Sequence, residues 1–205
     1  MVTDPNKYIV TGAPRNDFLY SSDGKSNMSK IFGNKIKDYN VIFFMPTFSE
    51  NKASKGVKLF NFDEFSLKDF DKFLEKNKCK LIFKPHPHDE EIVLKYFLDY
   101  NLNNFLILRN EDLSVSHLDL YELINASKIL ITDHSSVFYD FLLLDRPMIF
   151  APVNIDSYNE DRGFLIESFE TWAPGPKVFS QDELQFEISK CLTEKDYYGE
   201  KRAWM

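Results

Sequence analysis

The stretch Ile129-Leu130-Ile131-Thr132-Asp133-His134-Ser135-Ser136-Val137-Phe138-Tyr139-Asp140 indicates the fold more directly than any other part of the chain. Its first four residues are apolar or β-branched, as in a buried strand, and four polar residues follow them. A helical spacing of apolar residues then begins at Val137. Such a turn from strand to helix presents the hydroxyls of Ser135 and Ser136, with free backbone N–H groups, at the positive end of a helix, where phosphate binds favourably. The same residues also fit a helix cap that binds nothing, because Asp and Ser are common capping residues.

The rest of the chain alternates strand and helix patterns. Short apolar runs predict six strands, at residues 8–10, 41–45, 81–83, 105–108, 129–132 and 148–151. Capping boxes at Ser66 and Ser180 predict helices to about residues 77 and 193, and helical apolar faces occur at 90–100 and 120–124. This alternation predicts one α/β domain, a Rossmann-like parallel sheet with helices on both faces.

Positive side chains gather where the predicted strands end. Ligands of parallel sheets bind beyond the carboxyl ends of the strands. The residues that follow the strands include three of the four histidines, together with Arg15, Lys84 and Arg109, although the net charge is −7. We therefore predict an anion site at this edge, with Arg15 and Lys84 among its phosphate contacts.

His86 is the strongest candidate for chemistry. It lies in Lys84-Pro85-His86-Pro87-His88, where the two prolines restrict the backbone and hold the imidazole in one direction. Such a ring can donate to a phosphate oxygen or protonate a leaving group near neutral pH. The alternative is a metal site formed by His86, His88 and Asp89, but these residues do not make a complete ligand set. We expect phosphate contact for His86 without a metal, and an exposed turn for His88.

Composition and missing motifs exclude several classes of protein. The negative charge argues against nucleic-acid binding, and Cys79 and Cys191 lack metal-type spacing, which favours a reducing compartment. No signal-type segment or run of about 18 apolar residues occurs. We expect a cytoplasmic protein, with any attachment to the inner face of the membrane coming from other segments. No P-loop, G-x-G-x-x-G or G-x-S-x-G motif is present, so an ATPase, a dinucleotide oxidoreductase and a serine hydrolase are not indicated.

Six motif groups in order carry a resemblance to a known family. They are Thr11-Gly-Ala-Pro-Arg-Asn-Asp17, Met45-Pro-Thr-Phe48, Lys84-Pro-His-Pro87, the segment 130–140, Asp145-Arg-Pro-Met-Ile-Phe150, and Arg162-Gly-Phe164 with Pro174-Gly-Pro176. The set resembles the CDP-glycerol glycerophosphotransferases, bacterial polymerases and primases of wall teichoic acid and related capsule polymers. The resemblance spans residues 8 to about 179 and implies the C-terminal, nucleotide-binding half of a two-domain GT-B-type fold.

The resemblance assigns roles to individual residues. His86 corresponds to a family histidine near the donor diphosphate and is the expected catalytic residue. Ser135 and Ser136 match serines at the pyrophosphate-binding helix start, and Thr132 and Asp133 match the residues that lead into it. Arg162 lies in the family's Arg-Gly segment near the donor, although its neighbours Glu160 and Asp161 offer an ion pair instead. The family usually has Tyr where this chain has His134, so that position receives no role.

The implied reaction is transfer of glycerol phosphate from CDP-glycerol, or a related CDP-alditol, to a polymer or lipid-linked acceptor, with release of CMP. No metal or cofactor is expected. Residues 1–205 would form one donor-binding domain, and the acceptor-side N-terminal domain has no counterpart, so we expect binding without turnover unless a partner supplies it. Two alternatives remain: a GT-B glycosyltransferase that uses a nucleotide sugar for a surface polysaccharide, and a nucleotide-binding module without catalysis.

Overall fold

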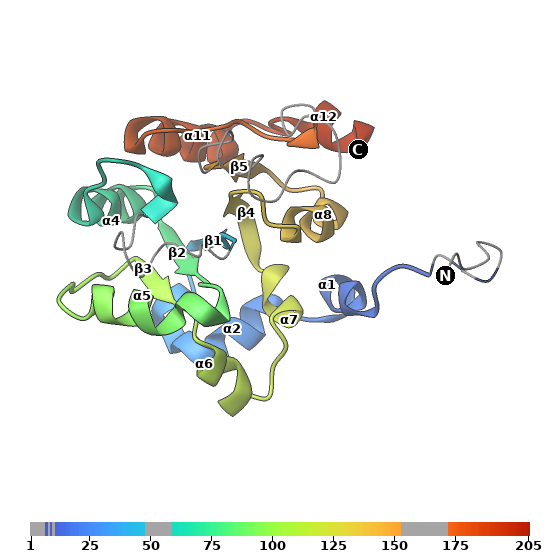
Figure 1. Ribbon diagram of the computed structural model, residues 1–205, viewed down its shortest axis with the longest axis horizontal. Coiled ribbons are helices and arrows are strands. Elements are labelled where there is room, and N and C mark those ends of the chain that lie inside the picture. Colours follow the sequence, from blue (N-terminus) through green and yellow to red (C-terminus); the bar gives the residue numbers. More distant parts are fainter. Residues whose placement is uncertain (1–6, 8, 10, 48–58, 153–171) are drawn as a thin grey trace, which may run out of the picture.

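A single parallel sheet forms the centre of the molecule. The computed structural model describes residues 7, 9, 11–47, 59–152 and 172–205. Within them, the strands lie in the order β3-β2-β1-β4-β5, and all neighbours are parallel. Their bounds are Asn40–Phe44 for β1, Cys79–Phe83 for β2, Phe105–Ile107 for β3, Ser127–Thr132 for β4 and Met148–Phe150 for β5 (Figure 1).

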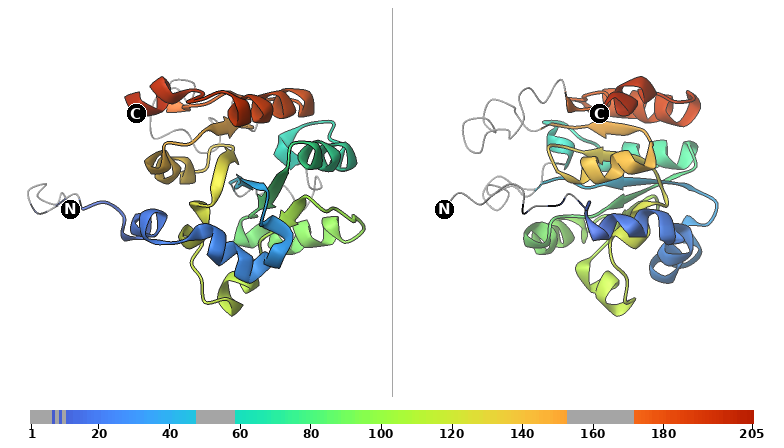
Figure 2. Two further views of the ribbon diagram at one scale, coloured as in Figure 1. Left: turned by 180° about the vertical axis from the view of Figure 1, so that it is seen from behind. Right: turned by 90° about the vertical axis from the view of Figure 1, so that its right-hand side faces the viewer.

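Helices lie in the connections and cover both faces of the sheet (Figures 1 and 2). The α-helices are α1 (Phe18–Ser21), α2 (Gly24–Phe32), α4 (Leu67–Lys76), α5 (Glu90–Phe97), α6 (Asn110–Val115), α7 (Tyr121–Ile124), α8 (Val137–Phe141), α11 (Gln181–Thr193) and α12 (Gly199–Trp204). Short 3-10 turns are η2 (Pro14–Asp17), η3 (Gly33–Ile36), η4 (Leu59–Asn61), η5 (Pro87–Asp89) and η6 (Leu142–Leu144).

Two hydrophobic clusters arise because successive strand side chains point to opposite faces. In β1, Ile42 and Phe44 pack in the cluster that contains residues of α4, α5 and α11. Val41 and Phe43 pack in the other cluster, with residues of α2, α7 and α8. Because this sheet is buried on both faces, each of its strands is a continuous apolar run in the sequence. These runs are what predicted the strands. The predicted α/β, Rossmann-like architecture is confirmed.

The sheet order reverses between β1 and β4. From β1 the chain moves outward to β2 and β3, and then returns to place β4 on the other side of β1 and β5 beyond it. Ligands of open α/β sheets bind at such a reversal, beyond the carboxyl ends of the two strands. The loops that begin at Met45 and Asp133 therefore occupy the position where this fold favours a ligand.

The predicted elements agree with the structure except at the amino end. Five of the six predicted strands are present within a few residues of the expected bounds. The sixth, residues 8–10, falls mainly outside the described residues. Ile9, which is described, is not in a strand and is 84% exposed, so it does not fit the buried strand expected from its apolar side chain.

The two predicted helix starts are confirmed by their side-chain caps. Ser66 Oγ accepts from the backbone N–H of Asp69 at 3.3 Å, and its hydroxyl donates to the Asp69 carboxylate at 2.8 Å. Ser180 Oγ accepts from the backbone N–H of Glu183 at 3.2 Å, and the Glu183 carboxylate reaches back to the N–H of Phe179. Each hydroxyl satisfies a donor that the first helical turn leaves without a partner.

Removing one cap should have a small, measurable cost. Ser66→Ala should lower the free energy of unfolding by about 1 kcal/mol, because the N–H of Asp69 loses its acceptor. Ser66→Thr keeps a hydroxyl at the same place and should retain most of the stability. Urea denaturation followed by circular dichroism measures both. Equal losses in the two variants would contradict the capping role.

Candidate functional site

A buried carboxylate joins the loops at the carboxyl ends of β1 and β4. Asp133 is 2% exposed. Its oxygens accept from the backbone N–H of Thr47 at 2.9 Å and from the Thr47 hydroxyl at 2.6 Å. The Asp133 carboxylate also accepts from the backbone N–H of Ser135 at 3.1 Å, which bends the chain toward α8. This carboxylate thus positions the two loops that flank the reversal of the sheet.

Thr132 adds a second link between the same strands. Its side chain is fully buried, and its hydroxyl donates to the carbonyl oxygen of Met45 at 2.7 Å. Thr132 and Asp133 therefore use their polar atoms on hydrogen bonds within the protein. They lead into the start of α8, and their contacts are those of residues that hold the two loops in position.

Ser135 and Ser136 leave unused donors at the start of α8. The Ser136 side chain makes no capping hydrogen bond, and the residue is exposed, while Ser135 is half-buried. In the described part of the chain, the backbone N–H groups of Ser136 and Val137 have no acceptor. The alternative of a pure helix cap is not supported by this geometry. Because α8 has only five residues, an anion here would be held by these donors more than by a helix dipole.

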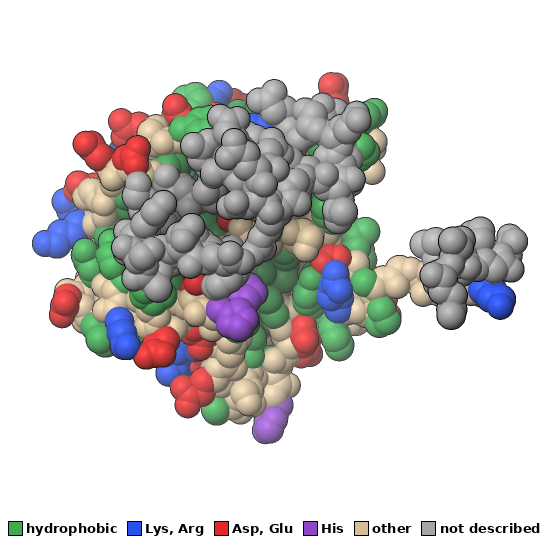
Figure 3. Space-filling view, viewed as in Figure 1, with side chains coloured by type: hydrophobic (Ala, Val, Ile, Leu, Met, Phe, Trp, Pro, Cys, Tyr) green, Lys and Arg blue, Asp and Glu red, His purple; other side chains and the backbone are tan. Residues whose placement is uncertain are grey.

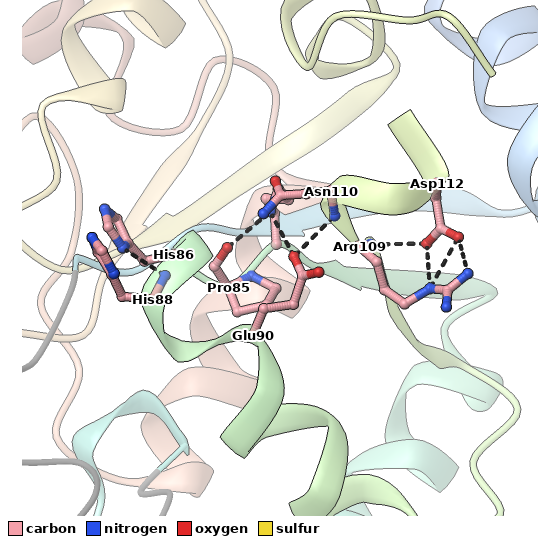
Figure 4. A network of polar contacts seen from close by, with 8 residues as sticks. Pro85, His86, His88, Glu90, Arg109, Asn110 and Asp112 are labelled. Atoms are coloured by element: carbon pink, nitrogen blue, oxygen red, sulfur yellow. Dashed lines mark hydrogen bonds and ion pairs between the residues drawn. The ribbon is translucent and has the colours of Figure 1, made fainter. Parts of the chain in front are cut away.

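His86 follows β2, the neighbour of β1. Its Nδ1 accepts from the backbone N–H of His88 at 3.3 Å, and the two imidazole rings stack with centroids 5.2 Å apart (Figure 4). A nitrogen that accepts carries no proton, so the neutral ring carries its proton on Nε2. Histidine side chains lie near the middle of the face shown in Figure 3. His86 is half-buried, and the geometry suits an Nε2–H donor.

Lys84 does not offer a free ammonium group. Its side chain is 6% exposed, and Nζ donates to the Pro85 carbonyl at 2.9 Å and pairs with Glu90 at 3.5 Å. The same Glu90 oxygen accepts from the backbone N–H of Asn110 at 2.9 Å (Figure 4). Burial lowers the pKa of Lys84, and Glu90 opposes that shift. These contacts tie the loops after β2 and β3 together, and the predicted phosphate contact of Lys84 gains no support from them.

Arg15 pairs with an acidic side chain of α8. Its Nη2 lies 3.0 Å from the Asp140 carboxylate, and its guanidinium lies over the Tyr121 ring at 5.3 Å. The Tyr121 hydroxyl donates to the same carboxylate oxygen at 2.5 Å. Burial, with the nearby Asp140 charge, raises the pKa of Tyr121 to about 12. Arg15 thus links η2 to α8. Because its charge is paired with Asp140, the predicted phosphate contact of Arg15 is not favoured.

Of the other two cations, only Arg109 lies in the described residues. Arg109 pairs with Asp112 at 2.5 Å (Figure 4) and with Glu111 at 2.9 Å, so carboxylates neutralise its charge. Arg162 lies outside the described residues. Thr47 was not among the predicted site residues, although its place directly after the first buried strand could have indicated it.

The described residues contain neither a metal-binding cluster nor a membrane-spanning helix. No three side chains of His, Cys, Asp or Glu come together there in a way that could hold a metal ion, so the His86–His88 metal alternative gains no support. None of the helices in these residues is both long and apolar enough to cross a bilayer.

Comparison with known proteins identifies the family. The model of the family described as CDP-Glycerol:Poly(glycerophosphate) glycerophosphotransferase matches residues 2–205, so the chain belongs to this family and the resemblance is confirmed. The teichoic acid poly(glycerol phosphate) polymerase of Bacillus spizizenii is 34% identical over 197 residues, which cover 92% of this chain and 46% of the relative. The poly(ribitol-phosphate) polymerase of that species is 31% identical over 192 residues, 88% of this chain and 28% of the relative.

A solved structure has the same architecture. The wall teichoic acid polymerase TagF superposes with a TM-score of 0.71 and 25% identity, covering 98% of this chain and 47% of that chain. A TagF variant soaked with CDPG superposes with a TM-score of 0.67. The chain therefore spans less than half the length of each of these relatives.

A double-mutant cycle tests the link between the two loops. Asp133→Asn should lower the free energy of unfolding by about 2 kcal/mol, because it removes a buried charged acceptor from the N–H groups of Thr47 and Ser135. Thr47→Val should cost about 1 kcal/mol through the lost hydroxyl donor. Since both changes remove the same hydrogen bond, the double variant should lose less than the sum. Losses that add within about 0.5 kcal/mol, measured by urea unfolding, would contradict the link.

Proposed function

We propose that this chain is the donor-binding half of a CDP-glycerol glycerophosphotransferase of teichoic acid biosynthesis. Residues 1–205 act as one donor domain of a GT-B-type enzyme, and the diphosphate of CDP-glycerol, or a related CDP-alditol, binds at the carboxyl ends of β1 and β4. The main support is the start of α8, where the N–H groups of Ser136 and Val137 lack acceptors among the described residues and the Ser136 hydroxyl does not cap the helix. Membership of the family supports the choice of donor.

The proposed reaction is a displacement at phosphorus. An acceptor hydroxyl attacks the β-phosphate of the donor, the bond to CMP breaks, and a phosphodiester forms while the hydroxyl proton passes to a base. The donor half contributes positioning and stabilisation of phosphate charge. Ser135, Ser136 and the α8 amides donate to the diphosphate, and His86 Nε2–H donates to the departing phosphate. Asp133 and Thr132 keep these donors in place, and Arg162 is a further candidate contact.

Acceptor activation belongs to a different domain in this proposal. The chain matches less than half of the related polymerases, and the acceptor-side half is expected to supply the base that takes the hydroxyl proton. The acceptor is a growing polymer or a lipid-linked primer, which would bring the assembly to the inner face of the cell membrane. This chain alone is expected to bind donor without transferring it.

Donor binding is the first test of this function. Calorimetry should show saturable binding of CDP-glycerol to the isolated chain, with competition by CMP stronger than by UMP or GDP. Ser135→Ala/Ser136→Ala should weaken binding by about tenfold or more, since each hydroxyl donates to a charged oxygen. Ser26→Ala/Ser29→Ala, two exposed serines of α2, is the matched control and should leave affinity unchanged. Stronger competition by UMP or GDP would favour a nucleotide-sugar enzyme.

The role of His86 can be separated from binding. In a protein that joins this chain to the acceptor-side half of a relative, His86→Ala should lower the transfer rate by about 100-fold or more while CDP-glycerol affinity is retained. His88→Ala is the control, because this exposed ring stacks on His86 and is given no role in the reaction. Transfer of radiolabelled glycerol phosphate measures both. An unchanged rate in His86→Ala would remove His86 from the chemistry.

A further inference from the structure

A cleft lies at the opposite end of β4 from the proposed donor site. It has a volume of about 600 Å³ and is formed where α1 leads into α2, where α7 leads into β4, and before β5. Figure 2 shows α2 on the near side of the molecule in its left view. The lining residues are Ser22, Asp23, Gly24, Lys25, Asn125, Ala126, Lys128 and Arg146.

The close approach of α2 gives this cleft a defined wall. A Cβ on Gly24 would lie 1.9 Å from Asn125 Oδ1 and 2.8 Å from the Ala126 backbone nitrogen, so only glycine fits. The Asn125 side-chain amide donates to the Ser22 carbonyl at 2.5 Å. The start of α2 is thereby held against the beginning of β4.

The cleft is lined by three cations, Lys25, Lys128 and Arg146. Among the described residues, none of the three forms an ion pair with a carboxylate. Arg15, Arg109 and Arg202, in contrast, each form an ion pair with Asp or Glu. The cleft contains one carboxylate, Asp23, whose Oδ1 accepts from the backbone N–H of Ser26 at 3.0 Å. In a chain with net charge −7, this cleft carries an excess of positive charge.

Arg146 is the fixed part of this charge. Its Nη1 donates to the carbonyl oxygens of Asn125 and Ser127, each at 2.5 Å, which sets the plane of the guanidinium. Its Nε and Nη2 have no acceptor among the described residues, so one edge of the fork is unused. Burial alone lowers the pKa of Arg146, and no carboxylate opposes the shift. A half-buried guanidinium without a counter-ion is unfavourable, and a bound anion would relieve that cost.

We propose that this cleft binds a phosphate ester, with the free edge of Arg146 contacting two phosphate oxygens and Lys25 and Lys128 adding charge. Arg suits this role because its planar fork matches two oxygens of one phosphate. Lys128 lies near the first residue of β4, four residues before Thr132 and about 13 Å from it along the strand, so the cleft is separate from the proposed diphosphate site. The phosphate can belong to a free ester or to a lipid headgroup.

Binding of sn-glycerol 3-phosphate to the chain tests the site directly. In two-dimensional NMR at constant ionic strength, the backbone amides of Lys25 and Lys128 should shift and saturate. Lys25→Gln/Lys128→Gln should raise the dissociation constant at least tenfold. Lys68→Gln/Lys195→Gln removes the same charge from exposed positions outside the cleft and should leave the constant unchanged. Arg146→Lys keeps the charge but loses the fork, and should also weaken binding.

A second arm identifies the source of the phosphate. Sedimentation with phosphatidylglycerol vesicles, compared with phosphatidylcholine vesicles, should show binding that Lys25→Gln/Lys128→Gln abolishes if a lipid headgroup is the ligand. Saturable binding that depends on the cleft lysines, in either arm, supports the site. Shifts that never saturate, or equal weakening in the Lys68→Gln/Lys195→Gln control, overturn it. Neither arm uses CDP-glycerol, so the result is independent of the proposed transferase function.

Discussion

The hydrogen bonds of Asp133 are the constraint on which the proposed donor site depends. One buried carboxylate accepts from Thr47 and from Ser135, and so determines how the loops after β1 and β4 lie relative to each other. Parallel pairing brings the strand ends together but leaves the direction of the following loops open. If the carboxylate were lost, the half-buried N–H groups of Thr47 and Ser135 would lose their acceptor, at a total cost of about 2 kcal/mol. The amides at the start of α8 would then have no fixed direction.

The strands and helix caps could be predicted because their signals are local. A strand buried on both faces is an apolar run, and the Ser66 and Ser180 caps involve residues only three positions apart. The edge of the sheet where the proposed donor site lies could be predicted from the parallel direction of the strands alone. The reversal between β1 and β4 also agrees with the place where the motif Asp133-His134-Ser135-Ser136 was expected to act.

The pairing of the cations could be predicted only in part. Arg15 bonds to Asp140 across 125 positions and Thr47 to Asp133 across 86, and nothing in the local sequence indicates such partners. The ion pair of Arg109 with Asp112 could have been predicted, because residues three positions apart at the start of a helix often pair. Counting positive residues at the strand ends therefore overestimated the free charge there. The donors that remain are mostly backbone N–H groups, which composition does not reveal.

A crystal structure of the chain with CDP-glycerol would test the proposed donor site most directly. The diphosphate should lie beside the N–H groups of Ser136 and Val137, with phosphate oxygens within hydrogen-bond distance of the Ser135 or Ser136 hydroxyl and His86 Nε2. A nucleotide bound at another edge of the sheet, with the start of α8 covered by protein side chains, would contradict it.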